Sequence, residues 1–269
     1  MELSDRVAVV TGGASGIGRA MAGRFIAEGA RGVMIADINA TLAEKVAAEL
    51  GEPAMGSGCD VSVEDELGAV ISQAQDVFGD IDLFCANAGI ASGQGVDAPD
   101  EVWERMLAVN LHAHVLAARR LLPGWLERGE GYFLTTASAA GLVTQIGDAP
   151  YAVTKHAAVA FAEWLAVTYG GRGVRVSCLC PMGVDTPLVR TGLDAGGEQG
   201  LGARVVAAAG ELLAPERVAA DVVDALREER FLILPHPEVL EFLRRKSSDY
   251  DRWIAGMQRL QAHVAGPAQ

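Results

Sequence analysis

Short apolar runs alternate along the chain with longer segments of helical periodicity. The runs are rich in β-branched and other apolar residues, as expected for buried strands. Seven of them predict strands, at about residues 6–11, 32–37, 53–59, 81–86, 131–137, 173–180 and 230–235. Because strands that alternate with helices form parallel sheets, the pattern predicts an α/β fold: a doubly wound sheet of about seven parallel strands with helices on both faces.

The segments between the predicted strands carry residues that are typical of helix ends. Ser62 and Asp65 have the spacing of a capping box and predict the start of one helix, and Pro215 predicts the start of another. Gly29, Gly79 and Gly170 predict helix ends.

The chain shows no repeat and no linker rich in proline or serine, so we expect one domain over residues 1–269. Glycines crowd residues 192–202, and such a segment can bury little, so it predicts a mobile loop. This is either a tolerant surface loop or a lid. Because it follows the carboxyl end of a strand, where open α/β sheets bind ligands, we expect residues 185–214 to form a mobile substrate lid.

Composition and charge exclude several classes of partner. Hydrophobic residues make up 50% of the chain, but no apolar run approaches the ~18 residues of a membrane-spanning helix. The net charge of −13 would repel nucleic acid and anionic membranes, so we expect neither as a partner.

The N-terminal residues and the cysteines indicate the compartment. The chain begins directly with a strand-like pattern and has no secretory leader, which predicts a cytoplasmic protein. The cysteines are few, lack metal-ligand spacing and are interpreted as core thiols: Cys59, Cys85, Cys178 and Cys180. The histidines also lack metal-ligand spacing, so no metal site is expected; they are His112, His114, His156, His236 and His263.

A turn rich in glycine follows the first predicted strand and precedes a helical pattern. The turn reads Thr11-Gly12-Gly13-Ala14-Ser15-Gly16-Ile17-Gly18. Glycines let backbone approach phosphate closely, and a helix N-terminus adds amide donors and partial positive charge. The turn therefore predicts the pyrophosphate cradle of a Rossmann-like fold, although its spacing is not G-x-G-x-x-G and it lacks the ending of a nucleoside-triphosphate loop.

An acidic residue ends the second predicted strand. Asp37 lies 19 residues after the last glycine of the turn, where a carboxylate can accept hydrogen bonds from both hydroxyls of an adenosine ribose. A 2′-phosphate would be repelled there, so the position favours NAD over NADP. Neither Ser15 nor Ile38 is basic, although Arg19 is nearby. The alternative interpretation is a turn residue ahead of Asn39.

A tyrosine and a lysine stand four residues apart in a segment with a helical pattern. Tyr151 and Lys155 therefore share one face of a helix expected over about 149–170. A neighbouring ammonium and an oxidised nicotinamide both favour the phenolate, so we expect the pKa of Tyr151 to fall. Ser138 ends the fifth predicted strand, so its hydroxyl can point over the same sheet edge. The alternatives are an amphipathic surface pair and a turn serine.

In combination and order, these motifs resemble the short-chain dehydrogenase/reductase family over about residues 5–190. The matching motifs are Thr11-Gly12-x-x-x-Gly16-Ile17-Gly18 as cofactor fingerprint, Asp60-Val61 after the third strand, Asn87-Ala88-Gly89 at the fourth, Asn110 in a helix, and Ser138 with Tyr151 and Lys155 as catalytic set.

The resemblance implies an NAD-dependent oxidoreductase that interconverts a secondary alcohol and a ketone or aldehyde by direct hydride transfer. Tyr151 would be the general acid and base, Lys155 would lower its pKa and bind the nicotinamide ribose, and Ser138 would hydrogen-bond the substrate oxygen. Asn110 would hold a water that links the lysine to solvent. The residues implied to bind the cofactor are Gly12, Ser15, Gly16, Ile17, Gly18, Asp37, Asp60, Val61, Asn87, Ala88, Gly89, Tyr151, Lys155, Pro181, Val184 and Thr186.

Two positions depart from the family pattern. Met182 follows Pro181 where the family usually has glycine, and we expect it to narrow the nicotinamide end of the pocket. Contacts from the Val184 backbone and the Thr186 side chain are expected to survive. Ala86 stands before Asn87 where the family commonly has a second asparagine, and we expect this change to matter less.

The residues expected on the substrate side are mostly apolar: Leu142, Val143, Gln145, Ile146 and Met182. They predict an apolar or weakly polar substrate.

A helical extension is expected over residues 236–263. Trp253, Ile254, Met257 and Leu260 recur there at helical spacing, which usually indicates packing. This stripe covers either the active-site cleft or a neighbouring subunit.

The resemblance also implies that the chain forms a homo-oligomer, and alternative functions remain open. Family members pair the helices that carry Asn110 and Tyr151, so a homotetramer or homodimer is expected. The alternatives are an NADP-dependent carbonyl reductase, a non-catalytic NAD-binding regulator, which would be expected to lose Tyr151 or Lys155, and a nucleotide-sugar epimerase or dehydratase, which generally needs a longer chain.

Overall fold

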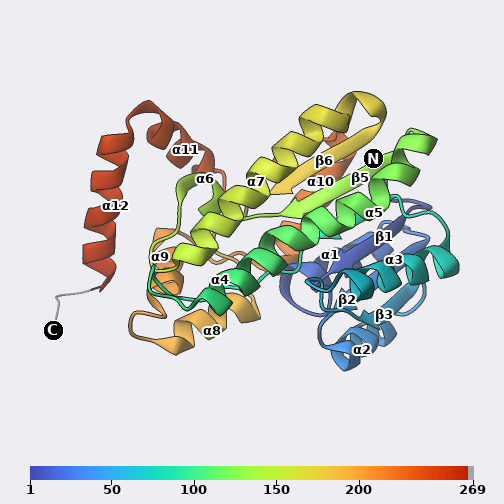
Figure 1. Cartoon of the computed structure of the whole chain (residues 1–269), viewed down its shortest axis with the longest axis horizontal. Helices are drawn as coiled ribbons and strands as arrows, with labels where there is room; N and C mark the ends of the chain where they lie inside the picture. The colour runs from blue at the N-terminus through green and yellow to red at the C-terminus, as the bar shows by residue number, and fades with distance from the viewer. Residues whose placement is uncertain (266–269) are drawn as a thin grey trace.

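The structure, a computed structural model that describes residues 1–265, contains one parallel sheet (Figure 1). Its seven strands are β1 (Val7–Thr11), β2 (Gly32–Asp37), β3 (Ala54–Gly58), β4 (Leu83–Ala86), β5 (Gly131–Thr136), β6 (Val174–Leu179) and β7 (Leu232–Ile233). The predicted Rossmann-like fold with seven parallel strands is confirmed.

The strand order is β3-β2-β1-β4-β5-β6-β7, so the chain starts in the middle of the sheet and extends it first to one edge and then to the other. The order reverses between β1 and β4, and the carboxyl ends of these two strands flank a crevice where open α/β sheets bind ligands. Every residue of β1 and β5 is buried, as expected for central strands that are covered on both faces.

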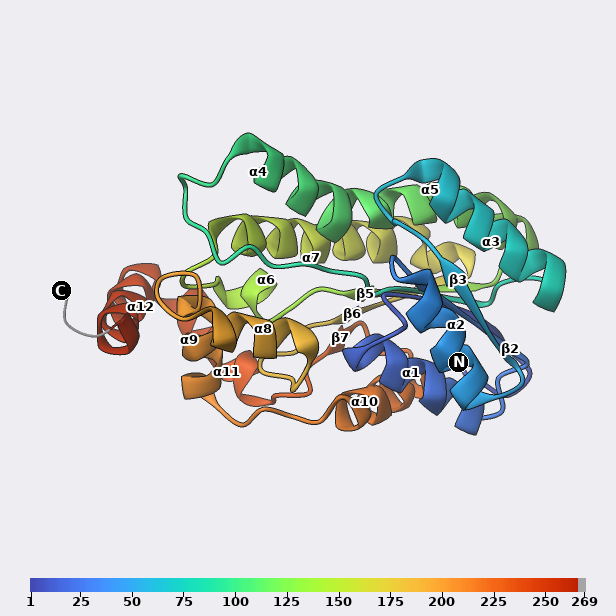
Figure 2. The same cartoon turned by 90° about the horizontal axis from the view of Figure 1, so that it is seen from below.

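Helices cover both faces of the sheet, with α3, α4, α5 and α7 on one side and α1, α2 and α10 on the other (Figure 2). The helices are α1 (Gly16–Ala27), α2 (Ala40–Leu50), α3 (Glu64–Phe78), α4 (Asp100–Leu107), α5 (Ala113–Arg128), α6 (Ala140–Val143), α7 (Ala149–Tyr169), α8 (Pro187–Ala195), α9 (Leu201–Ala209), α10 (Pro215–Glu228), α11 (Glu238–Ser248) and α12 (Tyr250–Ala265), with a π-helical turn over Ala108–His112 and a 3₁₀ turn over Gly170–Arg172.

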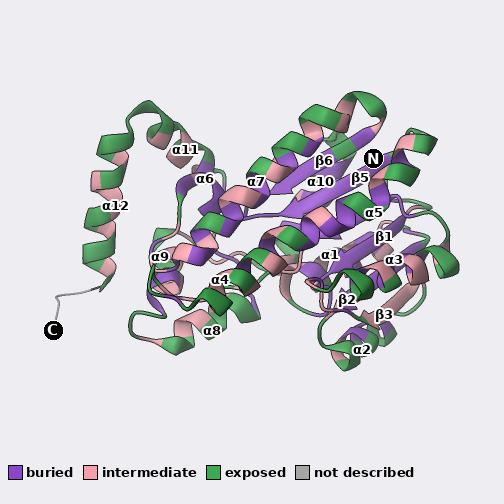
Figure 3. Cartoon of the chain, viewed as in Figure 1, coloured by how far each residue is buried: buried purple, intermediate pink, exposed green. Residues whose placement is uncertain are grey.

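Two apolar clusters hold these layers together. Met21, Phe25 and Leu226 belong to the cluster under α1, α2 and α10, and Leu67 and Trp125 belong to the cluster under α3, α5 and α7. Figure 3 shows the buried strands between helices whose outer faces are exposed. Because close-packed layers deform little, they fix the loops at the carboxyl edge of the sheet.

The predicted helix ends agree with the structure at four positions. Pro215 is the first residue of α10, Gly79 is the C-cap of α3, Gly170 is the C-cap of α7, and Gly29 follows α1 by two residues.

The predicted capping box is wrong. Helix α3 begins at Glu64 after Val63, which makes no side-chain cap, and the Ser62 hydroxyl donates instead to Asp60 at 2.7 Å. Because the Ser62 hydroxyl is bonded to the Asp60 carboxylate, it does not cap the helix. Acidic residues in the first turn of α3 stabilise the start of the helix instead, because their negative charge interacts favourably with the positive end of the helix dipole.

The glycine-rich segment is not the loop that was predicted. Helix α8 contains Gly192 and α9 contains Gly202, with only a short turn between them. A Cβ on Gly192 would lie 2.9 Å from the Cβ of Ala203, and one on Gly202 would lie 3.1 Å from the Ile146 carbonyl. These two glycines therefore permit close packing, and Leu201 is buried beside them.

Helices α11 and α12 form the end of the molecule farthest from the N-terminal strands (Figure 1). Met257, Leu260 and Val264 on α12 pack against a small buried cluster that includes Ile146 and Val205. Within residues 1–265, no helix is long and apolar enough to cross a membrane.

Candidate active site

A cleft of about 340 Å³ runs along the carboxyl edge of the sheet, across the point where the strand order reverses. The structure brings every sequence-predicted cofactor residue to its wall: Gly12, Ser15, Gly16, Ile17, Gly18, Asp37, Asp60, Val61, Asn87, Ala88, Gly89, Tyr151, Lys155, Pro181, Val184 and Thr186.

Close backbone packing explains two glycines of the turn after β1. Gly12 has φ +61°, and a Cβ there would lie 2.9 Å from the Cα of Ala88. A Cβ on Gly18 would lie 2.2 Å from the Gly12 carbonyl oxygen. Side chains at these positions would push the turn out of place and fill the approach to the N-terminus of α1.

The same turn presents donors suited to a phosphate. Ser15 is the N-cap of α1, and its side chain makes no capping hydrogen bond, so the hydroxyl stays available at the cleft. The first amides of a helix also lack intrahelical partners. The residues present therefore fit the pyrophosphate of a dinucleotide.

Thr11 and Asn87 join the turn to the end of β4. The Thr11 hydroxyl accepts hydrogen bonds from the backbone amides of Asn87 and Ala88, at 2.9 and 3.1 Å. The Asn87 side-chain amide donates back to the Thr11 carbonyl at 2.9 Å. These bonds fix the two walls of the cleft relative to each other.

Asp37 has the turn role, and its position is also compatible with the predicted ribose role. One carboxylate oxygen accepts from the Ala14 amide at 3.1 Å, and the other accepts from the Asn39 amide at 3.0 Å, as in a turn. The residue also lines the cleft. Because a carboxylate has about four lone-pair positions, capacity remains for ribose hydroxyls.

The basic residues near Asp37 are engaged elsewhere. Arg19 pairs with Glu49 at 2.9 Å and does not line the cleft. Arg105 does line it, but its guanidinium contacts the Asp60 carboxylate at 2.9 Å. Partial burial raises the pKa of Asp60, but the hydrogen bonds from Ser62 and Arg105 outweigh it and hold the pKa below its usual value.

The predicted catalytic set converges at the inner end of the cleft. Helix α7 carries Tyr151 and Lys155, and Ser138 lies two residues past β5. The Lys155 ammonium lies 5.6 Å from the centre of the Tyr151 ring and donates to the Thr136 carbonyl at 3.0 Å. The Ser138 hydroxyl accepts from the Ala140 amide at 3.1 Å.

Burial controls the protonation of this set. It raises the pKa of Tyr151 to about 12, although a hydrogen bond from Ser138 lowers it. Burial also lowers the pKa of Lys155 to about 8. The predicted fall in the Tyr151 pKa included the charge of a bound oxidised nicotinamide and stays a prediction. In the protein by itself, desolvation of the phenolate outweighs the effect of its neighbours.

Asn110 lies outside the wall of the cleft, in the π-helical turn between α4 and α5. Its side-chain oxygen accepts from the Ile90 amide at 2.9 Å, and its amide donates to the Ile90 carbonyl at 3.0 Å and to Thr154 at 3.1 Å. The buried side chain thus anchors the segment after β4 to α7. Its role in holding a water stays a prediction.

Sequence reasoning missed Asp148, which positions Tyr151. The carboxylate caps α7 by accepting from the Tyr151 amide at 3.0 Å, and it also accepts from the Ser92 and Gly93 amides, both at 2.7 Å. It therefore fixes the start of the catalytic helix against the loop after β4. An aspartate two residues before Pro150 is a helix-start signal that could have identified it.

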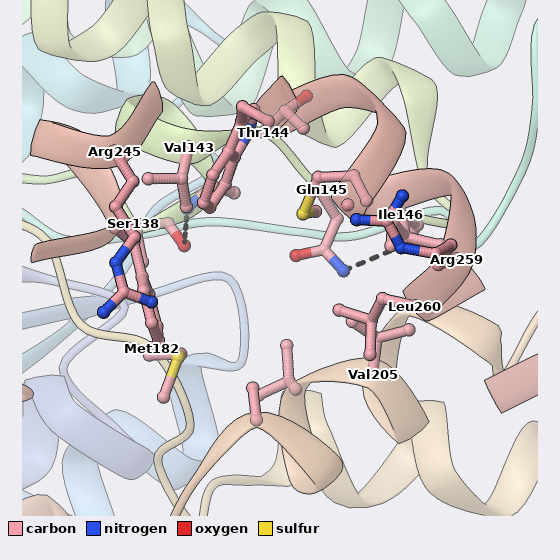
Figure 4. A pocket seen from close by; sticks show the side chains of 18 of the residues that line it. Ser138, Val143, Thr144, Gln145, Ile146, Met182, Val205, Arg245, Arg259 and Leu260 are labelled. Atoms are coloured by element: carbon pink, nitrogen blue, oxygen red, sulfur yellow. Dashed lines mark hydrogen bonds between the residues drawn. The ribbon is translucent and has the colours of Figure 1, made fainter. Parts of the chain in front are cut away.

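A second cavity of about 700 Å³ adjoins the cleft and shares Ser138 and Met182 with it (Figure 4). Val143, Gln145 and Ile146 line this cavity as predicted.

Leu142 does not line the cavity, so that prediction is wrong. It packs instead against the core cluster under α3, α5 and α7.

Much of the remaining wall of the cavity comes from α9, α11 and α12. Trp253, Met257 and Leu260 of the predicted stripe line it, which favours the interpretation that the stripe covers the active-site cleft, whereas Ile254 does not line it. The other lining residues from these helices were not predicted and include Val205, Phe242, Arg245, Arg252 and Arg259.

Met182 separates the cleft from the cavity. Its amide donates to Nδ1 of the buried His236 at 3.2 Å, and Nε2 of that histidine faces the Glu211 carbonyl at 3.3 Å. A Cβ on Gly210 would lie 2.9 Å from the Met182 methyl group. The methionine is thus held at the position where the family usually has glycine.

A doubly wound parallel sheet, with a glycine-rich turn after β1 and a carboxylate at the end of β2, defines a dinucleotide-binding α/β protein. Comparison with known proteins gives the family. The model of the short chain dehydrogenase family matches residues 6–195. The chain belongs to the short-chain dehydrogenase/reductase family of oxidoreductases.

Two relatives are named dehydrogenases. A 1-deoxy-11-beta-hydroxypentalenate dehydrogenase of Streptomyces exfoliatus is 38% identical over 262 residues, which cover 95% of this chain and 92% of that protein. A 2-(S)-hydroxypropyl-CoM dehydrogenase 3 of Xanthobacter autotrophicus is 39% identical over 183 residues, which cover 66% of this chain and 71% of that protein.

Solved structures of the family are similar over most or all of the chain. A short chain dehydrogenase/reductase from Burkholderia phymatum in complex with NAD has a TM-score of 0.85 and 27% identity, and the match covers 100% of this chain and 99% of that one. A 3-ketoacyl-(acyl-carrier-protein) reductase from Brucella melitensis complexed with NADH has a TM-score of 0.78 and 29% identity, with 87% of this chain and 98% of that one covered.

Proposed function

We propose that this protein is an NAD-dependent dehydrogenase that interconverts a secondary alcohol and its ketone or aldehyde. The observation that carries the proposal is that Ser138, Tyr151 and Lys155 line the cleft together and that Ser138 also lines the largely apolar cavity beside it. A nicotinamide cofactor in the cleft would supply the hydride acceptor or donor. A substrate in the cavity would then present its oxygen to the three side chains.

Tyr151 is the proposed general acid and base. Its phenolate would take the proton from the substrate alcohol during oxidation, and its hydroxyl would give a proton to the carbonyl oxygen during reduction. Ser138 lines both the cleft and the cavity, so its hydroxyl would steady the same substrate oxygen as charge develops there.

Lys155 is the proposed electrostatic partner of the tyrosine. Its pKa of about 8 leaves the ammonium mostly charged at neutral pH. Because the pKa of Tyr151 is about 12 in the protein alone, the phenolate needs further positive charge, which an oxidised nicotinamide ring brings. We therefore expect alcohol oxidation to become faster as the pH rises.

NAD is the proposed cofactor. Asp37 faces the cleft with lone pairs to spare, and the nearby Arg19 is paired with Glu49, so no free cation would offset a 2′-phosphate beside the carboxylate. The Burkholderia phymatum and Brucella melitensis structures, which hold NAD and NADH, support this choice.

Three further proposals concern the whole protein. Helices α8 and α9, within residues 185–214, would act as the substrate lid, since both flank the cavity or the cleft. The outer face of α7 exposes Val153, Trp164 and Val167, which supports assembly into a homodimer or homotetramer through this helix. The four buried free cysteines fit a reducing cytoplasm.

A panel of secondary alcohols tests the proposed function. Purified protein is mixed with each alcohol and either NAD or NADP, and absorbance of the reduced cofactor is followed. We expect turnover of bulky apolar alcohols with NAD and much weaker turnover with NADP. Absence of turnover with both cofactors across the panel, despite measured NADH binding, would contradict the proposal.

A further inference from the structure

The wall of the substrate cavity carries an excess of positive charge that the proposed chemistry does not use. Its charged lining residues are Arg245, Arg252 and Arg259 against a single acid, Asp249. The whole chain has a net charge of −13, so the positive charge of this wall is opposite in sign to that of the chain as a whole.

Two of the arginines have no acidic partner among residues 1–265. Arg245 pairs with Glu241 at 2.9 Å, and the Asp249 carboxylate accepts a hydrogen bond from the Arg252 backbone amide at 3.0 Å. No ion pair of the described chain includes the guanidinium of Arg252 or of Arg259. Their charges remain available to a ligand.

Arg252 and Arg259 share one face of α12. They are seven residues apart, which is nearly two helical turns, or about 10 Å along the axis. Trp253, Met257 and Leu260 beside them form the apolar part of the same wall. A ligand in the cavity would therefore meet apolar surface and guanidinium groups together.

Arg259 and the reactive position lie at different places in the cavity, whereas Arg245 lies on the side of Ser138 (Figure 4). Figure 4 shows Arg259 on the side of Gln145 and Ile146, whereas Ser138 and Met182 lie on the other side. A substrate whose oxygen reaches Ser138 would extend across the cavity toward α12.

We propose that the substrate is an apolar secondary alcohol or ketone with a carboxylate remote from the reacting carbon, and that Arg252 and Arg259 bind this carboxylate. The inference rests on the proposed function, because it assumes that the cavity takes the substrate. Planar guanidinium groups bind carboxylates through paired, charge-assisted hydrogen bonds. Both arginines are exposed to solvent, so the gain is about tenfold and not larger.

A series of matched substrate pairs tests the proposal. 5-Hydroxyhexanoate, 7-hydroxyoctanoate, 9-hydroxydecanoate and 11-hydroxydodecanoate each carry a secondary alcohol next to a terminal methyl group and a carboxylate at the other end. Each is compared with the 2-alkanol of the same carbon number. We expect kcat/KM with NAD to favour the hydroxy acid by about tenfold at the best length, mainly through KM.

The arginine variants assign the effect. The double variant Arg252→Gln with Arg259→Gln is expected to bring the ratio of hydroxy acid to alkanol close to one. Arg244→Gln is the control, since this exposed arginine lies on α11 outside the cavity wall. Direct titration with decanoate and decanamide, read by tryptophan fluorescence, gives affinities without turnover: decanoate should bind about tenfold more tightly.

The outcomes separate this proposal from the proposed function. If alkanols are oxidised but the hydroxy acids gain nothing and the double variant behaves like Arg244→Gln, the carboxylate proposal is overturned and the dehydrogenase proposal stands. If decanoate binds better than decanamide and the double variant removes that preference while no alcohol is oxidised, the arginine site is supported and the dehydrogenase proposal fails.

Discussion

The cleft proposed to bind the dinucleotide and the cavity proposed to bind the substrate are built in different ways. Strand ends and backbone hydrogen bonds form the cleft, where Thr11 and Asn87 fix the walls and Gly18 permits close packing. Helices α9, α11 and α12 supply much of the cavity wall through side chains such as Trp253 and Arg259. The shape of the cleft is therefore set by the backbone, whereas the shape and charge of the cavity are set by the side chains that line it.

The largest expected effect comes from breaking the backbone shape of the cleft. Gly18→Ala would place a methyl group 2.2 Å from the Gly12 carbonyl oxygen, so we expect NADH affinity to fall by about 100-fold or more and unfolding free energy to fall by about 2 kcal/mol. NADH fluorescence titration and urea unfolding measure the two quantities.

A matched control keeps this prediction specific. Gly68→Ala lies within α3, where an added Cβ meets nothing within 4 Å. It should leave NADH affinity unchanged and raise the unfolding free energy by about 0.5–1 kcal/mol. Equal behaviour of the two variants would count against a cleft held by close backbone contact.

The next effect comes from the cavity wall. Trp253→Ala with Met257→Ala removes two apolar side chains from it, so kcat/KM for an apolar alcohol should fall by about thirtyfold. NADH affinity should change less than about twofold, because neither residue touches the cleft. Ile254→Ala, on the more exposed side of α12, is the control. A parallel loss of NADH affinity would refute the separation of the two regions.

Asp37 sharpens the comparison within the cleft. Asp37→Ala removes the carboxylate beside the expected ribose, so the preference for NADH over NADPH should shrink by about tenfold. Asp37→Asn keeps an acceptor for the Ala14 amide and removes only the charge. Fluorescence titrations with both cofactors distinguish charge from turn structure, and an unaltered preference in both variants would remove Asp37 from cofactor choice.

The smallest expected effect concerns the buried ammonium of Lys155. Its pKa of about 8 lies below the ordinary 10.5, so the unfolded chain binds a proton that the folded chain has lost between these values, and stability contributed by this group rises with pH across that window. At neutral pH the folded chain carries the full cost of the buried charge.

Lys155→Met removes that cost and also the hydrogen bond to the Thr136 carbonyl. At each pH, we compare the unfolding free energy of the variant with that of the parent protein. We expect this difference, variant minus parent, to be about 1 kcal/mol more favourable to the variant at pH 7 than at pH 10. Urea unfolding at both pH values measures this difference. A gain that is larger at pH 10 than at pH 7 would contradict the lowered pKa.

The sequence predicted the cleft far better than the cavity. Strands and the glycine-rich turn follow from local pattern, so all predicted cofactor residues reach one cleft. The prediction of a capping box was wrong because the Ser62 hydroxyl donates to Asp60, which lies outside the helix. Residues 192–202 were misread because composition does not distinguish glycines that allow flexibility from glycines that allow close packing, as at Gly202.

The cavity wall was predicted only in part. The apolar stripe of α12 was recognised from its helical spacing, but Arg252 and Arg259 reach the cavity because α12 packs against α9, a tertiary arrangement with no local sequence signal. Asp148 differs, because its helix-start pattern was readable.

The central claim is that the Tyr151 hydroxyl exchanges the proton with substrate. Tyr151→Phe removes that hydroxyl and keeps the ring, so we predict that kcat with NAD and a secondary alcohol falls by about 10³-fold or more while the NADH dissociation constant changes less than about twofold. Turnover close to that of the parent protein, with NADH bound equally well, would contradict the account.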